Sequence, residues 1–279
     1  MFKILKKQEL SPGIFHYDIE APRVAKKARA GQFIVLRVNE EGERIPLTIA
    51  DFDREAGTIT LIFQVVGAST QLLASKNEGE SILDFVRPLG QPSEISENMG
   101  TIVCVAGGIG VAPVYPIARA MHEAGNKVIS ILGAKTKDIL IFEEKMRAIS
   151  DEVLIATDDG SYGVKGFVTT ALQQLVDRGE KIDQVTAIGP GVMMRSVAEA
   201  TRPLGIKTIV SLNPVMVDGT GMCGGCRVQV GDGMKFACVD GPEFDGHLVD
   251  FDSLMSRSRM FRPQEAQARD HICNIGLGR

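Results

Sequence analysis

One stretch decides the fold, TIVCVAGGIGVAP at residues 101–113. Its first half, Thr101–Ala106, is an apolar run typical of a buried strand, and the glycines after it predict a tight turn into a helix that ends near Ala124. Glycines and prolines interrupt the longer apolar run from Thr101 to Ala118, so a membrane span is not expected. Further strands are predicted at Lys127–Leu132, Glu152–Ala156 and Gln184–Ile188, with helical stretches between them. Strands that alternate with helices predict a doubly wound parallel sheet.

The loops at the C-terminal ends of these strands are the candidate nucleotide site, because doubly wound sheets bind ligands at that edge. The candidate residues are Gly108, Gly110, Asp158, Asp159, Gly189 and Pro190. The glycine turn departs from GxGxxG, since Pro113 stands at the third glycine. For either aspartate singly, a solvated turn is the simpler interpretation. Cys104, inside the first strand, is expected to be a packed core thiol.

Upstream, the chain consists of short strands separated by turns, with almost no helix. The predicted strands are Phe2–Leu5, Gly13–Ile19, Gln32–Val38, Ile45–Asp51, Thr58–Val66 and Ser81–Arg87. Hydroxyl residues at Ser69 and Thr70 predict the start of one short helix. This pattern indicates a small antiparallel barrel.

Two segments of this barrel could hold a flavin. In Arg44-Ile45-Pro46-Leu47-Thr48, a guanidinium suited to pyrophosphate and a hydroxyl lie on one face of one strand. In Val65-Val66-Gly67-Ala68-Ser69-Thr70, a strand ends on glycine and a helix begins, which leaves backbone N–H groups for phosphate. Each segment alone is weak evidence, because exposed arginines are usually solvated and such turns usually only cap a helix.

Downstream, three of the five cysteines lie within sixteen residues, in VDGTGMCGGC at residues 217–226 and at Cys238. The spacing Asp218-x4-Cys223-x2-Cys226 matches the plant-type iron–sulfur run C-x4-C-x2-C, with a carboxylate in place of the first thiolate. Predicted strands at Arg227–Val230 and Met234–Cys238 form a hairpin that returns Cys238 to the others. The candidate metal ligands are therefore Asp218, Cys223, Cys226 and Cys238.

Other interpretations of this cysteine module stay open. The same four side chains could hold structural zinc tetrahedrally. Asp218 could instead be a turn residue, with another group completing the site. Cys273 is isolated and is not expected to be a ligand. Beyond Gly246, a short amphipathic helix is predicted, packed on its own domain or exposed to a partner subunit; its apolar residues are Leu248, Phe251, Leu254 and Met255.

Composition is that of an ordinary globular protein. The chain has 279 residues, 44% of them hydrophobic and 24% charged, with a net charge of -4. That charge gives no reason to expect nucleic acid. Thiols at ligand spacing and the lack of a recognisable targeting segment or membrane span indicate a cytoplasmic protein. The expected division is a barrel over 1–96, a nucleotide-binding domain over 97–212, and a cysteine module with tail over 213–279.

Five motifs in order, RIPLT, VVGAST, GGIGVAP, TDDGSYG and GPGVMM, resemble the ferredoxin-reductase flavoprotein superfamily. The terminal cysteines narrow the resemblance to electron-transfer subunits allied to the iron–sulfur subunit of dihydroorotate dehydrogenase. Asp218 favours the branch formed by the small subunits of bifurcating NADH-dependent ferredoxin:NADP oxidoreductases. The resemblance implies an FAD-binding barrel, an NAD(P) domain and a [2Fe–2S] module, with a larger flavin and iron–sulfur subunit as partner.

The resemblance also implies roles for single residues. Arg44 would hold the FAD pyrophosphate, and Thr48 would lie beside the reacting flavin ring. Gly108 and Gly110 would receive the dinucleotide phosphates. The remaining expected cofactor contacts are Pro46, Leu47, Val65, Gly67, Ser69, Thr70, Asp158, Asp159, Gly189 and Pro190. The sequence departs from many relatives at Ser69, where glycine is common, and at Ile188, where a cysteine often lies beside the nicotinamide.

The expected function is electron transfer between NAD(H), FAD and a [2Fe–2S] cluster, onward to the larger subunit and through it to ferredoxin. NADP(H) stays open as the nucleotide, since Lys135 and Lys137 could meet a 2′-phosphate. Three alternatives stay open too. They are the dihydroorotate dehydrogenase electron-transfer subunit, a standalone reductase, and a zinc-stabilised nucleotide-binding module without redox activity.

Overall fold

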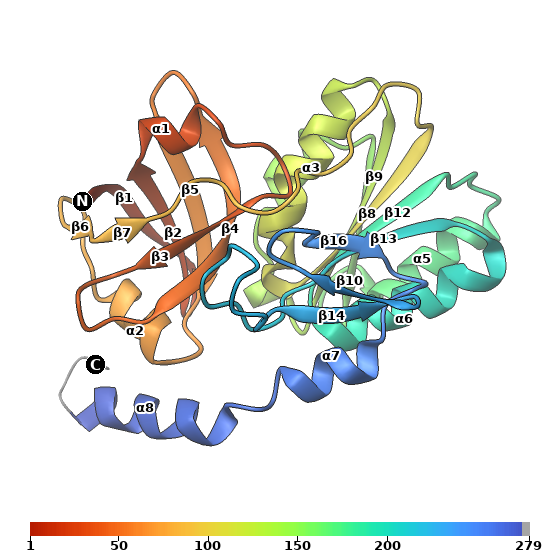
Figure 1. The fold of residues 1–279 in the computed structure, drawn as a ribbon. Coiled ribbons are helices and arrows are strands. Elements are labelled where there is room, and N and C mark those ends of the chain that lie inside the picture. The colour runs from red at the N-terminus through yellow and green to blue at the C-terminus, as the bar shows by residue number, and fades with distance from the viewer. Residues whose placement is uncertain (275–279) are drawn as a thin grey trace.

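The computed structural model describes residues 1–274, which form two seven-stranded sheets and a two-stranded hairpin (Figure 1). The first sheet is antiparallel, in the order β6-β1-β2-β5-β4-β3-β7. Its strands are β1 (Phe2–Ser11), β2 (Ile14–Glu20), β3 (Phe33–Arg37), β4 (Arg44–Asp53), β5 (Thr58–Gln64), β6 (Ser81–Ile82) and β7 (Asp84–Phe85). The edge strands β6 and β7 are almost consecutive in the chain, so the sheet curls into a nearly closed barrel.

The barrel interior explains why these segments become strands. In β5, five successive residues from Ile59 to Phe63 are buried, between an intermediate Thr58 and an exposed Gln64. Tyr17 and Phe63 meet edge to face with ring centroids 5.1 Å apart. The Tyr17 hydroxyl donates to the carbonyls of Leu73 and Lys76, which ties α2 (Ala68–Ala74) to the barrel.

The second sheet is parallel except at one edge, in the order β11-β10-β9-β8-β12-β13-β16. Its strands are β8 (Thr101–Gly107), β9 (Lys127–Ala134), β10 (Glu152–Thr157), β11 (Val164–Lys165), β12 (Gln184–Ile188), β13 (Lys207–Ser211) and β16 (Glu243–Asp245). Helices α3 (Val111–Glu123) and α4 (Glu143–Arg147) cover one face; α5 (Val168–Asp177), α6 (Gly191–Thr201) and α7 (Phe251–Arg257) cover the other. Alternate residues of β8 face the two sides, with Val103 and Val105 in one core and Cys104 in the other.

These observations confirm the predicted fold class, a barrel followed by a doubly wound sheet and a small cysteine module. Cys104 is fully buried, as expected of a core thiol, and burial raises its pKa to about 12. The sequence interpretation missed β11, β13 and β16. It also made one strand of Ser81–Arg87, which the structure divides into β6 and β7.

The C-terminal module is joined to the central sheet. Its hairpin pairs β14 (Arg227–Val230) with β15 (Gly233–Phe236), and β16 then adds antiparallel to β13. The predicted second hairpin strand ends at Phe236, so Cys238 lies in the turn beyond it. Helix α7 packs against α6 of the central domain as well as against β14 of its own module, and α8 (Arg262–Asn274) then extends below α2 of the barrel (Figure 1). Among the described helices, none combines the length and apolar content needed to cross a membrane.

Candidate functional site

The first candidate flavin segment lies on a half-free strand. Residues Arg44–Thr48 of β4 pair with β3 on one side, whereas pairing with β5 begins only at Ile49. Pro46, which has no N–H to donate, is tolerated because of this free edge. A strand edge with unpaired backbone groups can receive a ligand. Arg44 is exposed and Thr48 is half-buried, so both side chains are accessible.

The second candidate flavin segment is held close to the first. Ser69 Oγ donates to Glu43 Oε2 over 3.1 Å, which joins the start of α2 to the residue before Arg44. The Thr70 hydroxyl is occupied, since it accepts from the backbone N–H groups of Val66 and Gly67. The structure therefore brings the two segments together, while it gives Thr70 a capping role in the turn.

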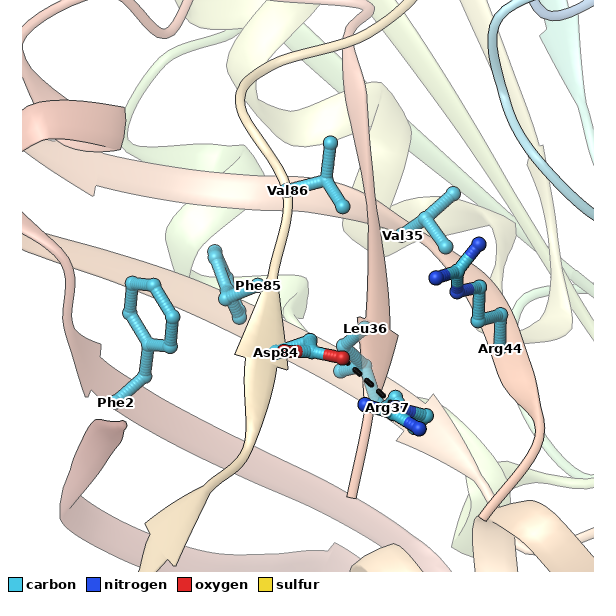
Figure 2. A pocket seen from close by; sticks show the side chains of 8 residues that line it. All are labelled: Phe2, Val35, Leu36, Arg37, Arg44, Asp84, Phe85 and Val86. Atoms are coloured by element: carbon cyan, nitrogen blue, oxygen red, sulfur yellow. Dashed lines mark hydrogen bonds and ion pairs between the residues drawn. The ribbon is translucent and has the colours of Figure 1, made fainter. Parts of the chain in front are cut away.

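Arg44 also borders a surface pocket of about 340 Å³ on the barrel (Figure 2). Its remaining lining comes from Phe2, Val35, Leu36, Arg37, Asp84, Phe85 and Val86. Inside it, Arg37 Nε donates to Asp84 Oδ2 over 2.7 Å, which pins β7 to β3. The Arg37 side chain is therefore engaged in an ion pair with Asp84. Arg44 is the pocket arginine that has no described side-chain partner.

The candidate nucleotide loops meet where the strand order reverses. Successive strands run from β8 to β9 and β10 on one side, whereas β12 lies on the other side of β8. A Cβ on Gly110 would come 2.2 Å from the Ile188 carbonyl oxygen, so the two loops touch backbone to backbone. A Cβ on Gly189 would likewise lie 3.1 Å from the Cα of Gly107. Doubly wound sheets bind their ligands where the strand order reverses, so these loops stay the candidate nucleotide site.

Met193 is a contact of these loops that sequence analysis missed. Its sulfur would lie 2.4 Å from a Cβ on Gly107 and 3.0 Å from one on Gly189. The thioether therefore fills the space that both glycines leave. The GPGVMM motif contains Met193, but nothing in its spacing distinguishes this side chain from the buried Met194.

The two candidate ribose-binding aspartates have different surroundings. Asp159 Oδ1 accepts from the backbone N–H of Ser161 over 2.9 Å and from its hydroxyl over 2.7 Å, and these bonds lower the pKa of Asp159. Its carboxylate therefore stabilises the loop. Asp158 has no described side-chain hydrogen bond and is exposed, so it is the freer of the two for a ribose. Both follow β10 at the same sheet edge as Gly108 and Gly110.

The carboxylate of Asp218 organises the cysteine loop. Oδ1 accepts from the N–H of Thr220 over 2.8 Å and Oδ2 from that of Cys223 over 2.9 Å, and these bonds lower the pKa of Asp218. Gly219, Gly221 and Gly224 all have positive φ, the conformation that glycine adopts without steric cost. Each carboxylate oxygen keeps a further lone pair, so these bonds are compatible with metal ligation.

The sulfurs of Cys223 and Cys226 accept hydrogen bonds from backbone N–H groups, as iron–sulfur ligands commonly do. Gly225 N–H donates to Cys223 Sγ and Cys238 N–H donates to Cys226 Sγ, each over 3.4 Å. Cys226 and Cys238 are buried side by side, and burial followed by the contact with Cys226 raises the pKa of Cys238 to about 12. Metal binding must therefore displace a proton from this thiol.

The donor set fits an iron–sulfur cluster in its chemistry, since thiols and N–H donors to sulfur are what such clusters use. Among the side chains that the structure describes, those of residues 1–268, no three Cys, His, Asp or Glu are already arranged as a metal site. The four-ligand set thus stays a prediction. Cys273, which was not expected to be a ligand, lies outside the residues whose side chains are described.

An arginine from α7 supports the same loop and was not singled out as a loop contact from the sequence. Arg257 Nη2 donates to the carbonyl of Gly225 over 3.0 Å, while its Nε is buried without a partner. This bond crosses from the helix face to the backbone between Cys223 and Cys226. The sequence places Arg257 one helical turn beyond Leu254, but it does not predict the hydrogen bond to Gly225, which depends on the tertiary fold.

The cysteine module packs directly on the barrel. Cys226 and Cys238 share one hydrophobic cluster with Phe33, Val35 and Leu89. A Cβ on Gly219 would lie 2.6 Å from Leu89 Cδ1 and 3.2 Å from Val35 Cγ2, so the cysteine loop approaches the barrel closely at this glycine. Phe33 and Val35 belong to β3, which pairs with the Arg44–Thr48 segment of β4. One strand therefore separates the candidate flavin segment from the candidate cluster ligands.

Comparison with known proteins matches two family models to the chain. Residues 104–199 match the oxidoreductase NAD-binding domain, and residues 213–250 match the iron–sulfur cluster binding domain of dihydroorotate dehydrogenase B. The second match favours iron–sulfur chemistry over structural zinc at the cysteines.

Individual relatives cover nearly the whole chain. A homologue of the dihydroorotate dehydrogenase B electron transfer subunit from Thermotoga maritima is 51% identical over 94% of this chain and 92% of its own. The electron transfer subunit from Streptococcus pneumoniae is 32% identical over 87% of this chain and 94% of its own. A chain in the structure of an NADH-dependent reduced ferredoxin-NADP oxidoreductase is 48% identical, with a TM-score of 0.93 and 98% of both chains covered.

More distant structures share the fold alone. Phthalate dioxygenase reductase is 17% identical, with a TM-score of 0.59 over 82% of this chain and 85% of its own. The predicted membership of the ferredoxin-reductase flavoprotein superfamily and the expected FAD, NAD and iron–sulfur cofactors are confirmed by these matches. The chain belongs to the family of dihydroorotate dehydrogenase B electron-transfer subunits and their homologues, as an oxidoreductase subunit with an NAD-binding and an iron–sulfur domain.

Proposed function

We propose that the chain is the small electron-transfer subunit of a bifurcating NADH-dependent ferredoxin:NADP oxidoreductase. It passes electrons between NAD(H), FAD and a [2Fe–2S] cluster, to a larger flavin and iron–sulfur subunit that serves ferredoxin. The observation that carries this proposal is the contact of β3 with both candidate sites: β3 pairs with Arg44–Thr48 on one side and packs on Cys226 and Cys238. Neighbouring strands are about 4.8 Å apart, so the two cofactors would be close.

The cofactors supply the electron chemistry, since a bound flavin links two-electron hydride transfer to the single-electron transfer of an iron–sulfur cluster. The residues of the chain would bind these cofactors and orient them. Arg44 offers a charged fork to a pyrophosphate, and Thr48 lies on the same strand face where the ring would lie. Gly108 has open space where a side chain would lie, so a dinucleotide phosphate could approach its backbone, and Gly110, Gly189 and Pro190 would shape the loops beside it. Asp218, Cys223, Cys226 and Cys238 would hold the cluster.

The proposed assignment of cofactors to domains follows the sequence expectation: FAD binds residues 1–96, NAD(H) binds 97–212 and the cluster binds 213–279. The remaining candidate FAD contacts are Pro46, Leu47, Val65, Gly67, Ser69 and Thr70. NAD(H) is preferred as the nucleotide because the similar solved structure is described as NADH-dependent. We also propose a cytoplasmic location, in keeping with free thiols at residues 104, 223, 226 and 238.

The test is anaerobic purification with analysis of FAD, iron and acid-labile sulfide, followed by reduction with NADH. We expect one flavin and two irons with matching sulfide, and bleaching of both chromophores on addition of NADH. Zinc without sulfide, together with no bound flavin, would contradict the proposal and leave a nucleotide-binding module without redox activity.

A second candidate function is the electron-transfer subunit of a dihydroorotate dehydrogenase. The match of residues 213–250 to that enzyme's iron–sulfur domain favours it. The two candidates differ in the large subunit, so mass spectrometry of the co-purifying chain separates them. A partner that oxidises dihydroorotate selects the second function, and a partner with its own iron–sulfur clusters and NADP(H) activity selects the first. Full turnover by the isolated chain would contradict both in favour of a standalone reductase.

A further inference from the structure

A cavity of about 380 Å³ lies between the barrel and α3, on the far edge of the central sheet from the candidate nucleotide loops. Helix α3 begins beyond the C-terminal end of β8 and returns antiparallel to it, so its last turns lie at the opposite edge. The helix contributes Arg119 and Glu123 from those last turns. The segment between β7 and β8 contributes Pro92 and Ser93. None of the residues assigned to flavin, nucleotide or cluster lines this cavity.

Three arginines converge on the cavity from separate parts of the chain, Arg29 and Arg54 from the barrel and Arg119 from α3. The guanidinium carbons of Arg54 and Arg119 lie 4.7 Å and 5.8 Å from the centre of the Phe52 ring. Arg119 Nη2 is held by Asp51 Oδ1 at 2.8 Å. One aromatic ring and one carboxylate thus position two guanidinium groups near each other before any ligand binds.

The donors of these arginines are only partly used. Arg54 Nη2 donates one hydrogen bond, to the Ala28 carbonyl over 2.9 Å. Arg29 is exposed, and its side chain has no hydrogen bond or ion pair within the described part of the chain. The acidic lining residue is Glu123, whose carboxylate is 3.9 Å from Arg119 Nε and 68% exposed. Like charges that converge in a concave site repel each other, and an anion bound between them would relieve that repulsion.

We propose that this cavity binds a small polyanion, a phosphate ester or a polycarboxylate, between the barrel arginines and Arg119. Guanidinium groups present paired N–H donors that match the two oxygens of a carboxylate or phosphate. A volume of about 380 Å³ exceeds one oxyanion and suits a ligand that carries two. Because Arg29 and Arg54 belong to the barrel and Arg119 to α3, the bound anion would join the two bodies. This inference does not depend on the proposed function.

The test is isothermal titration of the full-length protein, with its cofactors bound, using pyrophosphate and citrate as two separate probes. Saturating NAD⁺ fills the nucleotide crevice, and potassium chloride keeps ionic strength constant, because screening would otherwise mask or mimic the effect. We expect one site for at least one probe. Arg29→Ala should weaken binding about tenfold or more, since hydrogen bonds to charged groups are strong. Arg29→Lys should give an intermediate loss, because lysine keeps the charge without the fork.

Arg259→Ala is the matched control. It removes the same charge from an exposed arginine between α7 and α8, outside the cavity, and should leave the affinity unchanged. Equal affinity in Arg29→Ala and Arg259→Ala, or heats that potassium chloride reproduces, would overturn the proposal. Thermal melting in chloride checks that Arg29→Ala folds normally. If it does not, Arg119→Lys serves instead, because lysine can keep the contact with Asp51 while losing the second donor nitrogen.

Discussion

Two glycine-rich loops in this molecule use glycine for different reasons. At the β8–α3 turn, Gly110 is needed because a Cβ would meet the Ile188 carbonyl oxygen, which belongs to the backbone of the neighbouring loop. In the cysteine loop, Gly219, Gly221 and Gly224 are needed for their positive φ, and the loop is held mainly by the carboxylate of Asp218. The first loop is shaped by the rest of the sheet, whereas the second is shaped largely by its own side chains.

The largest expected effect is therefore at the first loop. Gly110→Ala forces backbone against backbone, where neither side can move cheaply, and overpacking of this kind costs about 1–3 kcal/mol or more. We expect a lower melting temperature and at least a tenfold rise in KM for NADH. Gly233→Ala is the control, because the nearest atom to its Cβ position is the Val230 carbonyl oxygen at 3.9 Å. If both variants bind NADH like the unmodified protein, the contact between the loops does not shape the nucleotide site.

The contrast between these loops also marks what sequence can predict. Spacing alone located the β8 turn and the cysteines, because strand periodicity and thiol spacing are local. Spacing did not predict that β16 would join β13, or that Phe33 and Val35 would cover Cys226 and Cys238. Those contacts join residues far apart in the chain and depend on how the barrel docks. Met193 and Arg257 were missed as site contacts for the same reason, since each reaches its loop only through the packing of its helix.

The second prediction tests whether Asp218 is a ligand or only a loop cap. Asp218→Cys keeps a donor at the predicted ligand position but removes both hydrogen bonds to Thr220 and Cys223. We expect a cluster that still assembles, with a shifted reduction potential and a changed EPR signal, because sulfur is a softer donor than carboxylate oxygen. Asp218→Asn controls for the loss of charge. A cluster with unchanged potential and EPR signal in the cysteine variant would show that Asp218 does not ligate iron.

The third prediction concerns Glu243 in β16, a half-buried residue whose carboxyl oxygen Oε1 accepts a hydrogen bond from Ser93 Oγ over 2.5 Å. Burial raises its pKa above the ordinary glutamate value. The folded state thus keeps a proton that the unfolded state has released, so stability falls as pH rises from the ordinary value to the raised one, by at most about 1.4 kcal/mol per pH unit. We expect Glu243→Gln to remove this decline in chemical denaturation measured across pH. The same decline in the variant would assign it to another group.

The smallest expected effect tests how far the cysteine loop relies on the rest of the fold. Arg257→Ala removes the hydrogen bond to the Gly225 carbonyl, which is worth about 1 kcal/mol. The backbone between Cys223 and Cys226 should then fluctuate more, and we expect faster loss of the cluster to a chelator, with the NADH affinity unchanged. Arg259→Ala, two residues along and exposed, is the control. Equal rates of cluster loss in the two variants would mean that Asp218 and the barrel wall alone hold the loop, so that α7 contributes only packing.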